Sequence, residues 1–161
     1  MLPIHTILHP TDFSDRSEAA FQLACLLARE SGARLIVLHV VQPPPFVTHG
    51  EMARALEQAE GYRRELNEKL HNLRDADPDL EMEHRLEDGE PVNEIMRAAT
   101  ETGSDLIVLG THGRTGFRRL LLGSVAEQVL RRAACPVLTV NTPFREASVS
   151  SLAHQQNGVA V

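Results

Sequence analysis

Cysteine is scarce in this chain, and so is any long apolar run. The 161 residues include two cysteines, Cys25 and Cys135, which lie far apart and show no C-x-x-C spacing. This pattern supports neither a disulfide framework nor a zinc site, so we interpret both as buried, reduced thiols. No segment approaches the roughly 20 apolar residues that span a bilayer, and the first residues lack the basic flank of a secretion signal. We expect a soluble, cytoplasmic protein without membrane insertion.

Acidic residues outnumber basic ones in the chain. The net charge is −6, and Lys69 is the single lysine. Phosphate backbones demand clustered cations, so the composition argues against a nucleic-acid surface. A P-loop nucleotide triphosphatase needs the pattern G-x-x-x-x-G-K-[S/T]. Lys69 lies on a predicted helix away from any such motif, so this class is excluded.

The length and composition fit one domain. With 42% hydrophobic and 24% charged residues, the chain can bury one core. No internal repeat or boundary divides it. We predict a single domain over residues 1–142, followed by a polar and flexible C-terminal tail over residues 143–161.

Short apolar runs alternate with helical patterns along the chain. Four runs are rich in β-branched residues, as is typical of strands buried on both faces of a parallel sheet: Ile4–His9, Leu35–Val41, Leu106–Leu109 and Val137–Val140. A fifth run, Leu80–Leu86, alternates apolar and charged residues and suits a half-exposed edge strand. Between the runs, apolar residues recur at helical spacing in four segments: Ala20–Ala28, Met52–Leu73, Val92–Ala99 and Ala126–Ala133. This order predicts an open, doubly wound α/β sheet with helices on both faces.

Ligands of such sheets bind beyond the carboxyl ends of the strands, and one loop there is rich in glycine. Gly110 follows a predicted strand at once, Gly113 comes next, and Gly123 precedes Ser124 where a helical pattern begins. Ser124 and Glu127 have the spacing of a capping box, which marks a helix start. Glycines let the backbone approach phosphates closely, and the N–H groups of a helix start bind them. The sequence therefore predicts a phosphate cradle.

These residues resemble the universal stress protein family. Its nucleotide-binding branch carries G-x-x-G-x(9)-G-[S/T] at this place, and the chain matches the pattern in full. The likeness also covers PTDFS at Pro10–Ser14, the LHVV end of the second predicted strand, the GEP turn and the terminal PVLTV. It extends from about Ile4 to Val140 and leaves the tail out.

The resemblance implies an ATP-binding protein with five parallel strands in the order 3-2-1-4-5. It implies these nucleotide-binding residues: Pro10, Thr11, Asp12, Val40, Leu109, Gly110, Gly113, Gly123, Ser124 and Val125. Asp12 would lie near the phosphates and hold magnesium, which prefers oxygen ligands. Val40 would offer backbone groups to the adenine edge, while Leu109 and Val125 flank the cradle.

Several of these residues have a plainer interpretation. Asp12 could simply cap the next helix, and Val40 could be ordinary core. Leu109 and Val125 could do no more than pack. We expect the arginines of the glycine-rich loop, Arg114, Arg118 and Arg119, to face solvent. We interpret His39 and His112 as structural because no metal-ligand spacing includes them. A carboxylate ligand for Mg²⁺ at Asp12 is the interpretation we favour.

Related α/β folds do not fit as well. A response-regulator receiver has paired acids after the first strand and a lysine after the fifth, whereas this chain has Thr11-Asp12 and lacks that lysine. A Rossmann dehydrogenase requires G-x-G-x-x-G where this chain has Pro-Thr-Asp. The alternative that we keep is a dimeric interaction module of the same fold that binds no nucleotide.

Two further expectations concern assembly and activity. The last predicted strand, Val137–Val140, would leave an exposed apolar edge, so we expect a homodimer that pairs this strand with its copy. Rapid phosphoryl transfer needs several placed groups, and Asp12 is the only convincing one. We therefore expect a binder whose ATP occupancy signals to an unidentified protein partner, with little or no hydrolysis.

Overall fold

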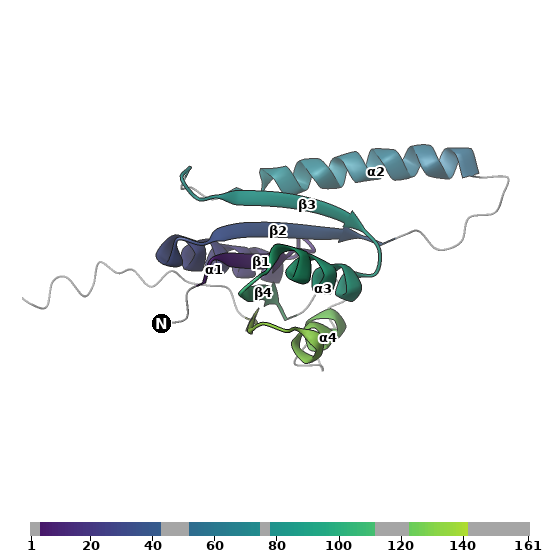
Figure 1. Cartoon of the computed structure of the whole chain (residues 1–161). Helices are drawn as coiled ribbons and strands as arrows, with labels where there is room; N and C mark the ends of the chain where they lie inside the picture. The colour runs from purple at the N-terminus through teal and green to yellow at the C-terminus, as the bar shows by residue number, and fades with distance from the viewer. Residues whose placement is uncertain (1–3, 43–51, 75–77, 112–122, 142–161) are drawn as a thin grey trace, which may run out of the picture.

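A five-stranded parallel sheet forms the centre of the molecule in the computed structural model, which describes residues 4–42, 52–74, 78–111 and 123–141. Strands and helices alternate along the chain (Figure 1). In chain order they are β1 (Thr6–Pro10), α1 (Asp15–Ser31), β2 (Arg34–Val41), α2 (Met52–Asn72), β3 (Met82–Asp88), α3 (Pro91–Thr102), β4 (Leu106–Gly110), α4 (Ser124–Arg132) and β5 (Val137–Val140).

The strand order is β3-β2-β1-β4-β5, with every neighbouring pair parallel. This confirms the predicted order 3-2-1-4-5 and the doubly wound α/β class. The predicted tail over residues 143–161 lies outside the described residues, so its flexibility stays a prediction. None of the described helices is long and apolar enough to cross a membrane.

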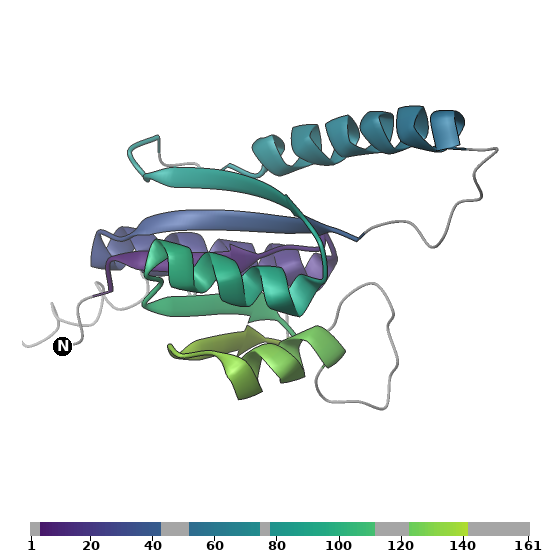
Figure 2. The same cartoon turned by 45° about the vertical axis from the view of Figure 1, so that its right-hand side comes forward.

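Helices cover both faces of the sheet, α1 and α2 on one side and α3 and α4 on the other (Figure 2). Successive residues of the central strands contribute to opposite cores: Ile7 packs with α1, whereas Leu8 packs with α3 and α4. Both side chains are fully buried. The β-branched and leucine-rich runs thus form strands because both of their faces are covered by apolar helix surfaces.

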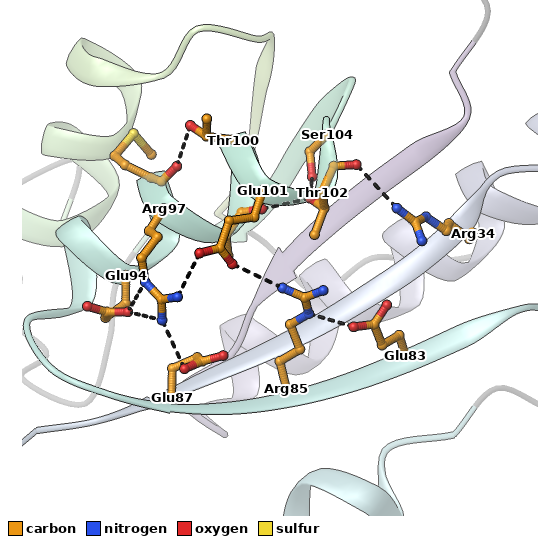
Figure 3. A network of polar contacts seen from close by, with 12 residues as sticks. Arg34, Glu83, Arg85, Glu87, Glu94, Arg97, Thr100, Glu101, Thr102 and Ser104 are labelled. Atoms are coloured by element: carbon orange, nitrogen blue, oxygen red, sulfur yellow. Dashed lines mark hydrogen bonds and ion pairs between the residues drawn. The ribbon is translucent and has the colours of Figure 1, made fainter.

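The edge strand β3 differs from the prediction in one respect. Its residues from Met82 to Glu87 are all half-buried, although the alternating sequence predicts one exposed face. Ion pairs explain the partial burial of the charged face (Figure 3): Arg85 contacts Glu83 of its own strand and Glu101 of α3, and Arg97 of α3 contacts Glu87. The edge position itself is confirmed.

Candidate nucleotide-binding site

The predicted site lies where β1 and β4, the two neighbouring strands at the centre of the sheet, end together. Thr11 follows β1 and Thr111 follows β4, and both residues are buried. The N–H of Thr11 donates to the carbonyl of Leu38 in β2 at 2.8 Å, whereas the N–H of Thr111 donates to Val140 in β5 at 3.0 Å. The two strand ends therefore turn their backbone donors away from each other. The strand order reverses at this point, and open α/β sheets bind ligands at such a reversal.

The loop after β1 is held by its own side chains. The Thr11 hydroxyl accepts from the Phe13 N–H at 3.1 Å and from the Ser17 hydroxyl at 2.8 Å. The carbonyl of Thr11 is bonded to Nδ1 of His39 at 2.7 Å, which ties the loop to the end of β2. These contacts fix the loop before any ligand arrives.

Phe13 is held in an unusual backbone conformation within this loop. Its φ is 61°, the left-handed region that non-glycine residues adopt only at some cost. The Phe13 ring lies against the His39 ring, with centroids 4.5 Å apart. This contact lies between the loop and the neighbouring strand and helps to hold the strained residue.

Asp12 lies at the centre of the same loop and is half-buried. Its Oδ1 accepts from the Ser14 N–H at 3.0 Å and from the Ser14 hydroxyl at 2.6 Å. Ser14, and not Asp12, is the N-cap of α1, because its side chain accepts from the Ser17 N–H at 3.3 Å. The plainer interpretation of Asp12 as the helix cap is therefore wrong. Its second oxygen, Oδ2, makes no hydrogen bond to any residue that the structure describes, so a carboxylate oxygen remains for a cation.

Gly110 has a role that the sequence did not reveal. A Cβ at this position would lie 2.9 Å from the carbonyl carbon of Arg16 and 3.1 Å from the backbone nitrogen of Ser17. Both atoms belong to the first turn of α1, which cannot move away without disturbing the loop. The glycine thus allows the start of α1 to pack directly on the end of β4.

The helix start after the glycine-rich loop is confirmed, but its cap is not the predicted one. Gly123 is the N-cap of α4, with φ −69° and ψ 154°, and Ser124 is the first helical residue. No side chain of the described residues caps this helix start. The predicted capping box of Ser124 and Glu127 is therefore wrong. The N–H of Gly123 donates to the carbonyl of Thr111, which joins the start of α4 to the end of β4.

The remaining predicted residues fall into three groups. Pro10 ends β1 and is half-buried. Leu109 belongs to the core beneath α3 and α4, against which Val40 and Val125 also pack, so all three have the packing role that their plainer interpretation predicts. Gly113 lies outside the described residues. The nucleotide contacts proposed for these positions stay predictions.

Two histidines at the site bond to backbone carbonyls. In addition to the contact of His39 with Thr11, Nδ1 of His9 lies 2.8 Å from the carbonyl oxygen of Val108 in β4. Burial lowers the pKa of His9 to about 4, against the opposing effects of the Val108 carbonyl and of Asp12, so the ring is neutral at pH 7. Among the described residues, no cluster of three or more histidine, cysteine or acidic side chains could hold a metal ion. His39 has the structural contact with Thr11 described above, its lack of any other role stays a prediction, and His112 lies outside the described residues.

His9 itself was missed in the sequence. The signal was its position before Pro10 in a predicted central strand, because proline cannot donate to a ladder and leaves a carbonyl in need of a partner. Phe13 gave no comparable signal, since its strained φ depends on contacts with β2.

Comparison with known proteins gives one consistent result. The family model described as the universal stress protein family matches residues 3–141. A universal stress protein of Methanocaldococcus jannaschii is 39% identical over 145 residues, which cover 87% of this chain and 84% of the relative.

Solved structures agree with the sequence comparison. A universal stress protein of Lactobacillus plantarum has a TM-score of 0.74 at 25% identity and covers 88% of this chain and 100% of its own. A universal stress protein in complex with cAMP has a TM-score of 0.58 at 29% identity, with 86% of this chain and 98% of its own covered. The fold, the strand ends and these matches together show that the chain belongs to the universal stress protein family.

Proposed function

We propose that the chain binds an adenine nucleotide, foremost ATP, between the ends of β1 and β4. The observation that carries the proposal is the divergence of Thr11 and Thr111, whose N–H groups donate to opposite sides of the sheet. The start of α4 is tied to Thr111, so first-turn N–H groups that no described side chain caps lie beside the end of β4. Such groups favour an anion.

A relative of the same fold supports the choice of an adenine nucleotide. The structure in complex with cAMP is 29% identical to this chain over most of its length. The preference for ATP rests on the full glycine pattern, which supplies close backbone approach along a chain of phosphates.

Magnesium fits the proposed site as a companion of the phosphates. Asp12 offers one carboxylate oxygen, and Mg²⁺ is commonly bound by one or two carboxylates together with substrate phosphates and water. Asp12 would therefore hold the ion, which neutralises phosphate charge when bound. The hydrogen bonds from Ser14 fix the orientation of this carboxylate in advance.

We further propose that hydrolysis is slow or absent. Fast phosphoryl transfer uses a cation on the transferred phosphate and a group that positions the attacking water. Lys69 lies on α2, where it pairs with Glu65 at 2.8 Å. His9 and His39 are both engaged with carbonyl oxygens. ATP occupancy, rather than turnover, would then be the signal that a protein partner reads.

The proposed assembly is a homodimer through β5. This strand is one edge of the sheet, and Leu138 is 38% exposed there. Pairing of two copies would cover this edge. The proposed location is the cytoplasm, where the thiols of Cys25 and Cys135 would stay reduced.

Native mass spectrometry of the purified chain, followed by a phosphate-release assay with added ATP and magnesium, tests the function. We expect a bound adenine nucleotide and turnover well below about one per second. A chain that neither retains nor takes up nucleotide would favour the alternative, a dimeric interaction module. Turnover above about one per second that is lost in Asp12→Ala would make the protein an ATPase.

A further inference from the structure

The hydrogen-bond ladder between β1 and β4 stops short of the strand ends. The last residue pair in register is Leu8 with Ile107. The next bond of a parallel ladder would run from the N–H of residue 10 to the carbonyl of Val108. Residue 10 is Pro10, which has no N–H. The ladder therefore ends there and leaves a buried carbonyl that needs another donor.

His9 supplies that donor from its side chain. Nδ1 lies 2.8 Å from the Val108 oxygen, and the ring is completely buried on the α1 side of the sheet, beside Phe21. A backbone bond would hold β1 and β4 at the spacing of a regular sheet, about 4.8 Å. A bond through the imidazole satisfies the carbonyl without imposing that spacing.

The state of Nε2, the other ring nitrogen of His9, indicates that the bond from Nδ1 to Val108 explains why a histidine occupies this position. Because Nδ1 donates to a carbonyl, Nε2 is an acceptor, and it has no partner in the part of the chain that the structure describes. A buried acceptor without a donor destabilises a fold, so packing alone would favour an apolar side chain at this position. The bond to Val108 is the compensating interaction.

The residues that follow are those of the proposed nucleotide site. Directly after the His9–Val108 contact, the N–H of Thr11 donates to Leu38 of β2 and the N–H of Thr111 donates to Val140 of β5. We propose that His9 is a positioning residue, which sets the opening between the loop Thr11–Ser14 and the end of β4 and thereby determines how well a nucleotide fits. This role rests on the proposed function.

Two substitutions of His9 by residues of nearly equal size test the hydrogen-bond donor separately from the imidazole ring. Asparagine at position 9 keeps an N–H close to the place of Nδ1, whereas leucine has almost the same shape and no donor. In calorimetric titrations with ATP and magnesium, we expect His9→Leu to raise the dissociation constant at least about fivefold and His9→Asn to stay within about twofold of the wild type. Equal weakening in both variants would overturn the positioning role.

Hydrogen exchange tests the same role without nucleotide. We expect the amides of Thr11–Ser14 to exchange about tenfold faster in His9→Leu and at the wild-type rate in His9→Asn, while α3 is unaffected in both. Identical loop exchange in the two variants would refute the inference. If the wild type binds no nucleotide, the proposed function fails, and the exchange comparison still decides whether His9 holds the loop.

Discussion

Gly110 at the end of β4 packs against the backbone of Arg16 in the first turn of α1, so closely that a Cβ would stand 2.9 Å from the Arg16 carbonyl carbon. Helix α1, which follows the loop after β1, therefore packs directly on β4, the strand that leads into the second loop of the site. This contact ties the end of β4 to the start of α1 through close backbone packing.

Gly110→Ala should therefore destabilise the fold. Overpacking against backbone typically costs 1–3 kcal/mol, and we expect about 2 kcal/mol in the free energy of unfolding by urea. Gly61→Ala is the matched control, because a Cβ at Gly61 in α2 would meet nothing within 4 Å. That change should stabilise the protein by about 0.5–1 kcal/mol through helix propensity. Equal stability of the two variants would contradict the close packing of α1 on β4.

Gly123→Val tests the phosphate cradle. The backbone of Gly123 is extended, with φ −69°, so valine can adopt it and the helix should start as before. We expect at least about tenfold weaker ATP binding by calorimetry, because a side chain would stand between the backbone and the phosphates. Far-UV circular dichroism should not change. We expect the same of Gly113→Val, and undiminished affinity in both variants would rule the cradle out.

Asp12→Asn tests the proposed magnesium ligand. Asparagine keeps an oxygen for the Ser14 hydrogen bonds but removes the charge, so the loop should stay intact. In the wild type, magnesium should tighten ATP binding, and in the variant this gain should fall by about tenfold or more. Titrations with magnesium and with a chelator measure the difference. The same magnesium dependence in both proteins would exclude Asp12 as a ligand.

Acidification should destabilise the protein through His9. Its pKa lies at about 4 in the folded chain and at 6.5 in the unfolded chain, so only the unfolded chain takes up the proton between these values. The stabilisation is complete above pH 6.5 and is lost as the pH falls. Between pH 7.5 and pH 5 we expect a loss of about 2 kcal/mol in the free energy of unfolding.

His84 adds to the same trend, because burial lowers its pKa as well. His9→Asn removes the contribution of His9 and should flatten the pH dependence over this range, with His84→Asn as the comparison for a less buried ring. A slope that His9→Asn leaves intact would show that His9 is not the group that titrates.

The edge strand β5 offers a test of assembly. Leu138→Lys places a charge on the exposed edge and should convert the proposed dimer into a monomer, as measured by light scattering at micromolar concentration. Tyr62→Lys is the control, because Tyr62 is 48% exposed on α2, a helix that packs along the opposite edge strand. A wild-type monomer, or a dimer that survives Leu138→Lys, would contradict pairing through β5.

The fold followed from the sequence because its signals are local. Runs such as Leu35–Val41 are apolar at every position except His39, which suits strands covered on both faces, and alternation marked Leu80–Leu86 as the edge. The cap of α4 could not be assigned in this way. Glycine and serine both favour the N-cap position, and only the backbone angles decide that Gly123 holds it.

The strand ends that make up the candidate site could be located from the sequence, but the contacts within it could not. The reversal of strand order points to the loops after β1 and β4 without any knowledge of side chains. The tie between His39 and Thr11, the strained Phe13 and the seating of α1 on Gly110 join residues from different strands and helices. Such contacts depend on how the elements pack, and no local pattern encodes them.

A calorimetric titration of the wild-type chain with ATP in the presence of magnesium tests the central claim most directly. Saturable binding of one nucleotide per chain is expected, with the heat abolished or strongly reduced in Gly123→Val and unchanged in Gly61→Ala. A wild-type chain that has been freed of nucleotide and then binds neither ATP nor another adenine nucleotide would contradict the account.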